Sequence, residues 1–166
     1  MTSIIKVDTL QKANGATPTA ADLGINTTGT VLQVVTNSQV GSFVTSSSSF
    51  TPNGLSLTIT PKLSTSKILL FLNCMIDTTA DRQVPWTIFR SINSATPTNL
   101  FHVSEGLGAA QDTRRYPLGA CAVDTSHGTT SSVVYSLYVR SSGSNTIEFP
   151  PFSAMTQWLI AQEISQ

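Results

Sequence analysis

The stretch that decides the fold is Leu55-Ser56-Leu57-Thr58-Ile59-Thr60, which Pro61 ends. Apolar and hydroxyl side chains alternate along it, so Leu55, Leu57 and Ile59 point to one side and the hydroxyls to the other. A period of two residues predicts a β-strand with one face in a core and the other in water.

Similar runs recur along the chain, separated by clusters of Ser, Thr, Gly, Asn and Pro, one of which is Pro52-Asn53-Gly54. No stretch keeps an apolar period of 3.6 residues for three turns. Roughly eight to ten runs at a spacing of about 8–12 residues predict an all-β fold, an antiparallel, jelly-roll-like β-sandwich. The expected strands cover residues 30–36, 55–60, 67–77, 83–92, 98–103, 115–123, 132–140, 145–149 and 156–164.

Residues 1–29 differ from the rest, because they are rich in Ala, Gly, Thr and Asn and cannot bury a core alone. We expect an extended N-terminal arm over 1–29 that docks on another surface, followed by one β-sandwich domain over 30–166. The alternative is a first strand folded back on its own domain. The apolar side chains that would dock are Ile4, Ile5, Val7, Leu10, Leu23 and Ile25.

Two of the expected strands, 67–77 and 132–140, are apolar on both faces. Since one face of an antiparallel sandwich strand ordinarily meets water, the second apolar face needs a second cover. The arm or a loop of the same chain could supply it, or a neighbouring subunit around a symmetry axis. Low charge favours the neighbour. The candidate interface residues are Leu69, Phe71, Met75, Val134 and Tyr138.

The low charge of the chain argues against some classes of binding partner. Nine Lys and Arg balance nine Asp and Glu, and only 11% of the 166 residues are charged, against about 25% in an ordinary domain. Ser and Thr number 22 and 24. A neutral chain lacks the basic patch that binds nucleic acid, so nucleic acid is not expected as a partner. The longest apolar run, Ile68 to Leu72, predicts no membrane insertion.

The sequence motifs predict no enzyme, no cofactor and no metal site. Asp124-Thr125-Ser126-His127 holds the residue types of a catalytic triad, but neighbours on one loop cannot ordinarily reach triad geometry, so we expect a hydroxyl-rich turn. Asp77 to Asp81 and His102 to Glu105 are too sparse in ligands for a calcium or zinc site. Cys74 and Cys121 are expected to be free and buried.

Exposed aromatic side chains could stack on a sugar. Trp86 and Trp158 share strand faces with apolar neighbours, so both are expected in the core. The sequence near Tyr116 is irregular, and the only basic pair precedes it. The candidate receptor-binding residues are therefore Arg114, Arg115 and Tyr116.

Several segments together resemble a known class of protein. They are Ser3 to Gln11, Gly29 to Val35, Asn53 to Pro61, Ser64 to Leu69, Phe89-Arg90, Tyr135 to Arg140 and Ile160 to Ile164. In these segments, which span most of the chain, the sequence resembles small fibre-type virion structural proteins of tailed bacteriophages, particularly marine and cyanobacterial ones.

This resemblance implies a β-sandwich knob that forms a homotrimer and binds other virion proteins through its N-terminal arm. The expected function is host attachment as a tail fibre or fibre-tip module, with a cell-surface glycan or protein as receptor. The expected location is the virion, after synthesis in the host bacterial cytoplasm. The alternative is a capsid decoration or cement protein, or a baseplate structural protein, with no receptor-binding role.

Overall fold

The computed structural model describes residues 9–18, 22–23, 28–78, 84–101, 108–110, 115–142, 146–149 and 154–166. These residues form eleven strands and no helix. The strands are β1 (Val31–Val40), β2 (Val44–Thr45), β3 (Thr51–Ile59), β4 (Lys67–Thr78), β5 (Val84–Ile92), β6 (Thr98–Asn99), β7 (Gly108–Ala110), β8 (Arg115–Asp124), β9 (Val133–Val139), β10 (Ile147–Glu148) and β11 (Thr156–Ile164).

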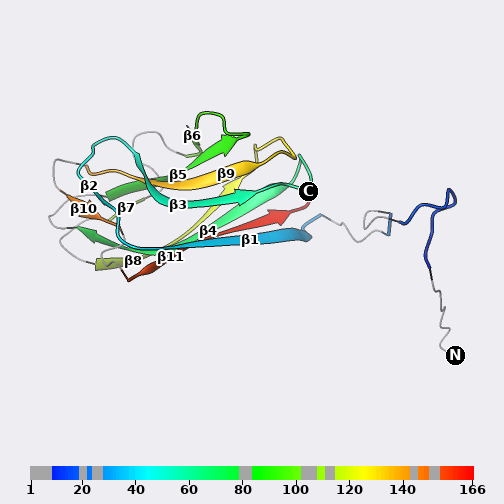
Figure 1. The fold of residues 1–166 in the computed structure, drawn as a ribbon, viewed down its shortest axis with the longest axis horizontal. Coiled ribbons are helices and arrows are strands. Elements are labelled where there is room, and N and C mark those ends of the chain that lie inside the picture. Colours follow the sequence, from blue (N-terminus) through cyan, green and yellow to red (C-terminus); the bar gives the residue numbers. More distant parts are fainter. Residues whose placement is uncertain are drawn as a thin grey trace, which may run out of the picture.

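The strands build two antiparallel sheets that face each other (Figure 1). The first sheet has the order β1-β11-β4-β10-β2, and β8 also pairs with β4. The second sheet has the order β3-β9-β5-β6, and β7 also pairs with β5. Every pairing in both sheets is antiparallel.

Five of the pairings are nested along the sequence. β1 pairs with β11, β2 with β10, β3 with β9, β4 with β8, and β5 with β7. Pairing of first with last and second with second-last, divided between two packed sheets, is the arrangement of a jelly roll. The predicted fold class, an all-β antiparallel sandwich of jelly-roll-like form, is confirmed.

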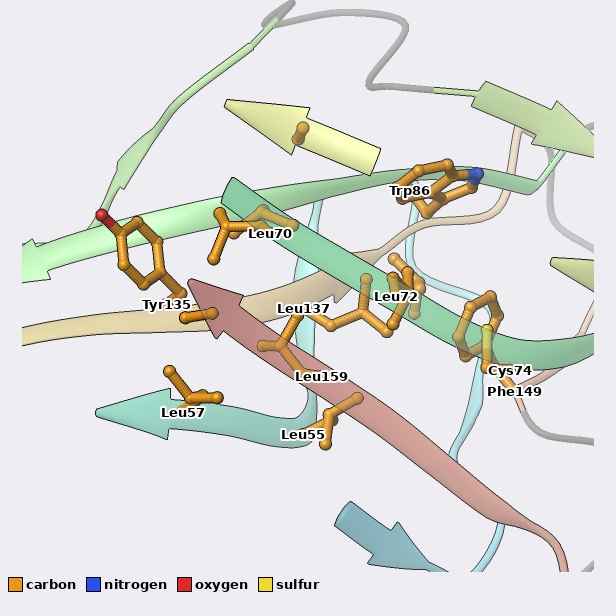
Figure 2. Packing of buried hydrophobic residues seen from close by; sticks show 14 of the residues in the cluster. Leu55, Leu57, Leu70, Leu72, Cys74, Trp86, Tyr135, Leu137, Phe149 and Leu159 are labelled. Carbon is orange, nitrogen blue, oxygen red and sulfur yellow. The ribbon is translucent and has the colours of Figure 1, made fainter. Parts of the chain in front are cut away.

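The core lies between the two sheets and is built by the alternation seen in the sequence (Figure 2). Leu55, Leu57 and Ile59 of β3 are buried, whereas Thr58 between them is exposed. A fully buried side chain of this size stabilises the fold by about 1.5–3 kcal/mol. The largest fully buried side chains are Tyr135, Phe149, Leu55, Leu57, Ile59, Ile68, Leu70, Ile88, Leu137, Ile147 and Leu159.

One predicted turn lies inside a strand. Pro52-Asn53-Gly54 belongs to β3, and the register of β3 against β9 shifts between Pro52 and Ser56. Gly54 has a φ of 98°, a conformation that favours glycine. The turn-forming residues thus make a β-bulge that bends the strand without ending it. The short strands β2 and β7 were not expected from the sequence.

The described residues before β1 contain no strand. The amide of Gly15 donates to Lys12 O at 2.8 Å, and the Lys12 ammonium pairs with Asp22 at 2.5 Å. In Figure 1 residues 9–18 lie beyond the end of the sandwich at which β1 begins. The first backbone bonds to the sandwich in this region join Gly29 and Thr30 to Ser165, after β11. The division into an arm over 1–29 and a domain over 30–166 stays a prediction.

Candidate functional site

The outer face of the first sheet is the most distinctive surface among the described residues. The strand register places every second residue of β1, β11, β4 and β8 on this side, and one row across the four strands runs through Thr36, Ile160, Phe71 and Cys121. We call it the uncharged face. It consists of Val34, Thr36, Ser38, Val40, Thr156, Trp158, Ile160, Gln162, Leu69, Phe71, Asn73, Met75, Pro117, Gly119, Cys121 and Val123.

None of the residues of the uncharged face is charged, and all of them are exposed or half-buried. Val34, Val40, Val123 and Trp158 are among the exposed large apolar residues of the described chain. Charged residues occupy the ends of the same register: Lys67, paired with Ile164, at one end, and Asp77, paired with Arg115, at the other. Large contiguous apolar surface on a soluble protein marks an interaction site.

A hollow of about 600 Å³ lies within the uncharged face. Trp158 and Ile160 of β11 line it together with Phe71 of β4 and Cys121 of β8. The amides of Asn73 and Gln162 add polar groups to the lining. The hollow therefore offers an aromatic and aliphatic bed with a few uncharged hydrogen-bonding groups.

The prediction that Trp158 is in the core is wrong, since 47% of this residue is exposed. β11 carries apolar side chains on both sides, so its hydrophobic pattern does not fix which side faces inward. The inward side holds Leu159 and Ala161 together with the polar Gln157 and Glu163, all fully buried. Which side of β11 faces inward is therefore apparent only from the hydrogen-bond partners of Gln157 and Glu163.

Glu163 is buried because donors from β1 and from the β3–β4 connection surround its carboxylate. The amides of Lys62 and Leu63, the Ser66 hydroxyl and the Gln33 amide all donate to it, at 2.5–3.0 Å. Burial by itself would raise the pKa of Glu163, but these hydrogen bonds hold the pKa below its usual value. On the same side of β11, the side-chain carbonyl of Gln157 accepts a hydrogen bond from the side-chain amide of Asn53 at 2.8 Å.

The predicted subunit-interface residues fall on two opposite surfaces. Leu69, Phe71 and Met75 are half-buried and lie together on the uncharged face. Val134 and Tyr138 lie on the outer face of the second sheet, since β9 alternates with its buried residues pointing inward. The structure therefore does not bring the five residues into one patch.

The second sheet covers part of its own outer face. The Tyr138 ring stacks on Phe89 with 4.0 Å between centroids, and Phe89 meets Phe50 edge-on at 6.2 Å. The Arg140 guanidinium lies 5.4 Å from the centroid of the Phe50 ring. For Tyr138, side chains of the same chain therefore supply cover, one of the two possibilities left open by the sequence.

The predicted arm and receptor residues are described only in part. Leu10 and Leu23 are 50% and 48% exposed. Ile4, Ile5, Val7 and Ile25 lie outside the described residues, as does Arg114. The backbones of Arg115 and Tyr116 begin β8 and pair with Asp77 and Ile76, but their side chains lie outside the description.

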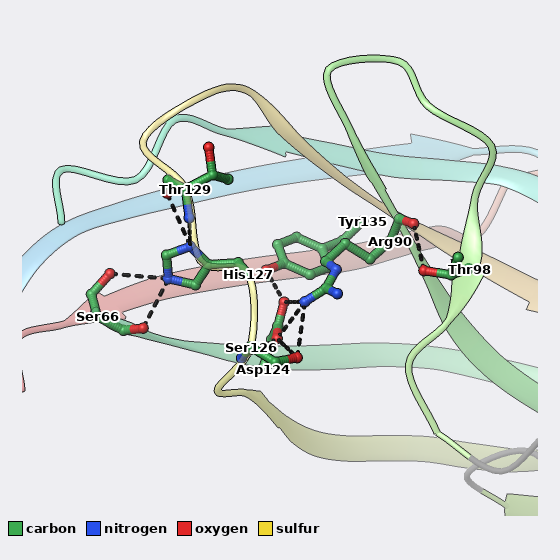
Figure 3. A network of polar contacts seen from close by, with 8 residues as sticks. All are labelled: Ser66, Arg90, Thr98, Asp124, Ser126, His127, Thr129 and Tyr135. Atoms are coloured by element: carbon green, nitrogen blue, oxygen red, sulfur yellow. Dashed lines mark hydrogen bonds and ion pairs between the residues drawn. The ribbon is translucent and has the colours of Figure 1, made fainter. Parts of the chain in front are cut away.

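A polar cluster surrounds the buried carboxylate of Asp124 (Figure 3). The Arg90 guanidinium donates to both oxygens of Asp124, at 2.8 and 2.9 Å, and the Tyr135 hydroxyl donates to the same carboxylate at 2.7 Å. Burial would raise the pKa of Asp124, but hydrogen bonds from the Ser126 amide, Tyr135 and Arg90 hold it below its usual value. Burial and the Asp124 charge raise the pKa of Tyr135.

The residue types of a triad at 124–127 do not assemble into one. Asp124 bonds with Arg90, Tyr135 and Ser126, whereas His127 points to the other side of the turn (Figure 3). His127 Nε2 donates to Ser66 O at 2.8 Å, and its Nδ1 lies 3.1 Å from Thr129 O. His127 is buried, and its hydrogen bonds stabilise the turn in place of forming a triad.

Metal and thiol chemistry have little support among the described residues. No group of three or more His, Cys, Asp or Glu in that part of the chain could hold a metal ion. His102 to Glu105 lies outside the description, as does most of the Asp77–Asp81 turn. Cys74 is free and buried as predicted, and burial raises the pKa of its thiol. The prediction for Cys121 is wrong in part: it is free but exposed, because it faces outward from β8.

Trp86 is buried, as predicted. Trp158 and Asn73 pair across β11 and β4 and form an exposed aromatic and amide pair, which was not predicted from the sequence. No helix in the described part of the chain is long and apolar enough to cross a membrane.

The sequence matches no protein-family model, and no curated protein matches it. Among solved structures, the chain is similar to one titled "Structure of Eiger TNF from S. frugiperda", with a TM-score of 0.44 and 9% sequence identity. The match covers 82% of this chain and 96% of that one.

Proposed function

We propose that the chain is a bacteriophage virion protein that attaches the particle to its host, as a homotrimeric tail-fibre or fibre-tip module. The observation that carries the proposal is the pairing of a β-sandwich with a preceding segment whose Leu10 and Leu23 are half-exposed. Apolar side chains on an otherwise polar segment gain stability when a partner covers them. The resemblance of the sequence to fibre-type virion proteins supports the same function.

Residues 1–29 bind other virion proteins, and the sandwich faces the cell. A single knob of low charge has little long-range attraction for a surface. Three knobs on one particle site raise the effective concentration of each for its receptor, so that weak binding to a glycan or surface protein becomes tight. The function requires no catalytic step and no cofactor.

Adsorption of the purified full-length protein tests this function. Fluorescently labelled protein is incubated with a panel of cyanobacterial and marine bacterial strains, and bound fluorescence is measured against concentration. The expected result is saturable binding to a few strains, with competition by unlabelled protein. Heat-unfolded protein is the control. Binding to no strain, or equal and unsaturable binding to all, would contradict a role in attachment.

The half-exposed leucines also fit a strap across a neighbouring capsid or baseplate subunit. A cement protein binds phage particles that lack it and raises their thermal stability. Full-length protein and a variant without residues 1–28 separate the roles, because that deletion keeps the bonds of Gly29 and Thr30 to Ser165. Particle stabilisation by the full-length chain without any adsorption to cells would favour the cement role.

A further inference from the structure

The uncharged face is a surface without a cover in the described chain. Trp158, Val34 and Val123 remain about half exposed there. Exposing a Trp and several Val residues on four adjacent strands leaves apolar area in contact with water, which costs about 25 cal/mol for each Å². A partner that covers this area is therefore favoured.

We infer that the uncharged face is the surface through which copies of this chain pack against one another. The inference rests on the homotrimer of the proposed function and adds which of the two outer sheet faces is buried in it. In the assembly, Trp158 of each copy lies at the subunit contact, and the hollow between β11, β4 and β8 is filled by side chains of a neighbour.

The size of the face suits a stable subunit contact. Four strands about 4.8 Å apart, with about 3.3 Å per residue, give a surface of roughly 20 Å by 25 Å. That is on the order of 500 Å² before the relief of the side chains is counted. A standard interface buries about 800 Å² on each partner, so a contact over the whole face has the right magnitude.

The absence of charge favours a second copy over an unrelated partner. In a threefold assembly, residues close to the axis approach their equivalents in the other copies, so a charged residue there would meet its own sign. The sixteen residues of the uncharged face include no such residue; the charged residues of the same register lie at its two ends, Lys67 at one and Asp77 with Arg115 at the other. Charge is depleted in the same way at the centres of protein interfaces.

The outer face of the second sheet does not fit this role as well. It carries Ser56, Thr58 and Ser136, whose hydroxyl groups can remain in contact with water. Its aromatic residues already pack against each other, with Tyr138 stacked on Phe89. A substitution on the outer face of the second sheet can therefore serve as the control for one on the uncharged face, because both positions lie in β-strands.

A matched pair of variants tests the inference on the full-length protein. Thr36→Lys places a charge on the uncharged face, and Thr58→Lys places the same charge on the second sheet; both threonines are exposed in strands. Trp158→Lys adds a charge near the centre of the uncharged face. Circular dichroism and thermal unfolding check that each variant folds, and sedimentation equilibrium gives its native mass.

We expect the wild type and Thr58→Lys at about 53 kDa, three times the 17.7 kDa chain, and Trp158→Lys and Thr36→Lys at the chain mass. Alkylation of Cys121 provides a second readout. It is expected to be at least about tenfold slower in the wild type than in Trp158→Lys, because burial at the contact excludes the reagent. Should Trp158→Lys not fold, Thr36→Lys decides.

A wild type at the chain mass would overturn the inference. Both Trp158→Lys and Thr36→Lys staying trimeric, or Cys121 reacting equally in all variants, would also overturn it. Adsorption to cells, measured on the same preparations, separates this failure from failure of the proposed function. A monomer that adsorbs saturably overturns the interface and the trimer but leaves the attachment role, whereas a trimer that dissociates on Trp158→Lys but adsorbs to no strain overturns only the attachment role.

Discussion

At the scale of single residues, the described chain concentrates its buried charge at two carboxylates. Asp124 has a cation, Arg90, beside it, whereas the partners of Glu163 are backbone amides, a hydroxyl and a side-chain amide. Both carboxylates join parts of the chain that are far apart in the sequence. Removing a partner from a buried polar group costs more than the bond itself contributes, so these sites control stability.

The Tyr135 hydroxyl is the clearest single bond to remove. Tyr135→Phe leaves the ring in the core but deletes the 2.7 Å donor to Asp124, so we expect a loss of about 1–3 kcal/mol in the free energy of unfolding. Tyr138→Phe is the matched control in the same strand, where the half-buried ring packs on Phe89. Urea unfolding measures both variants, and equal losses would contradict the account of the cluster.

Stability should fall in acid. The pKa of Glu163 and that of Asp124 lie below the ordinary values of 4.5 and 3.8 in the folded protein. Each carboxylate therefore adds stability above its ordinary value, and this is lost as the pH falls through the lower folded-state pKa. We expect a level free energy of unfolding from pH 7 to about pH 5, then a decline that Glu163→Gln makes shallower. Constant stability down to pH 3 would contradict this assignment.

At the scale of the elements, the sequence predicted most strands because their two sides differ. β3 alternates apolar and polar residues, so its inward face was predictable, and Leu55, Leu57 and Ile59 are buried. β11 has apolar residues on both sides, and its orientation depends on the hydrogen bonds of Gln157 and Glu163. No local pattern contains those bonds, because their partners lie about a hundred residues away.

The bulge in β3 carries a prediction at this scale. Gly54 and Gly41 both have positive φ, but a Cβ on Gly54 would meet the Gln39 amide at 2.5 Å, whereas at Gly41 there is open space. We expect Gly41→Ala to lose about 1 kcal/mol by backbone strain and Gly54→Ala about 1 kcal/mol more, because Gln39 must leave its bond to Asn53 O. Thermal unfolding compares them, and a smaller loss for Gly54→Ala would contradict this packing.

At the scale of the whole molecule, the two sheets have different outer surfaces. One is rich in hydroxyl groups and partly covered by its own aromatic residues, and the other is the uncharged face. The sequence indicated a second apolar side on two strands, with either the same chain or a neighbouring subunit as its cover, and grouped residues of both strands as interface candidates. Only the division of β4 and β9 between separate sheets shows that their outer sides point in opposite directions.

The central claim is that attachment depends on several knobs held together through the uncharged face. Its most direct test is the adsorption of labelled wild-type protein and Trp158→Lys to the same cells at equal chain concentrations. We predict that the wild type reaches half-saturation at a concentration at least about tenfold lower, because linked knobs bind with avidity. Equal half-saturating concentrations for the two proteins would contradict the claim.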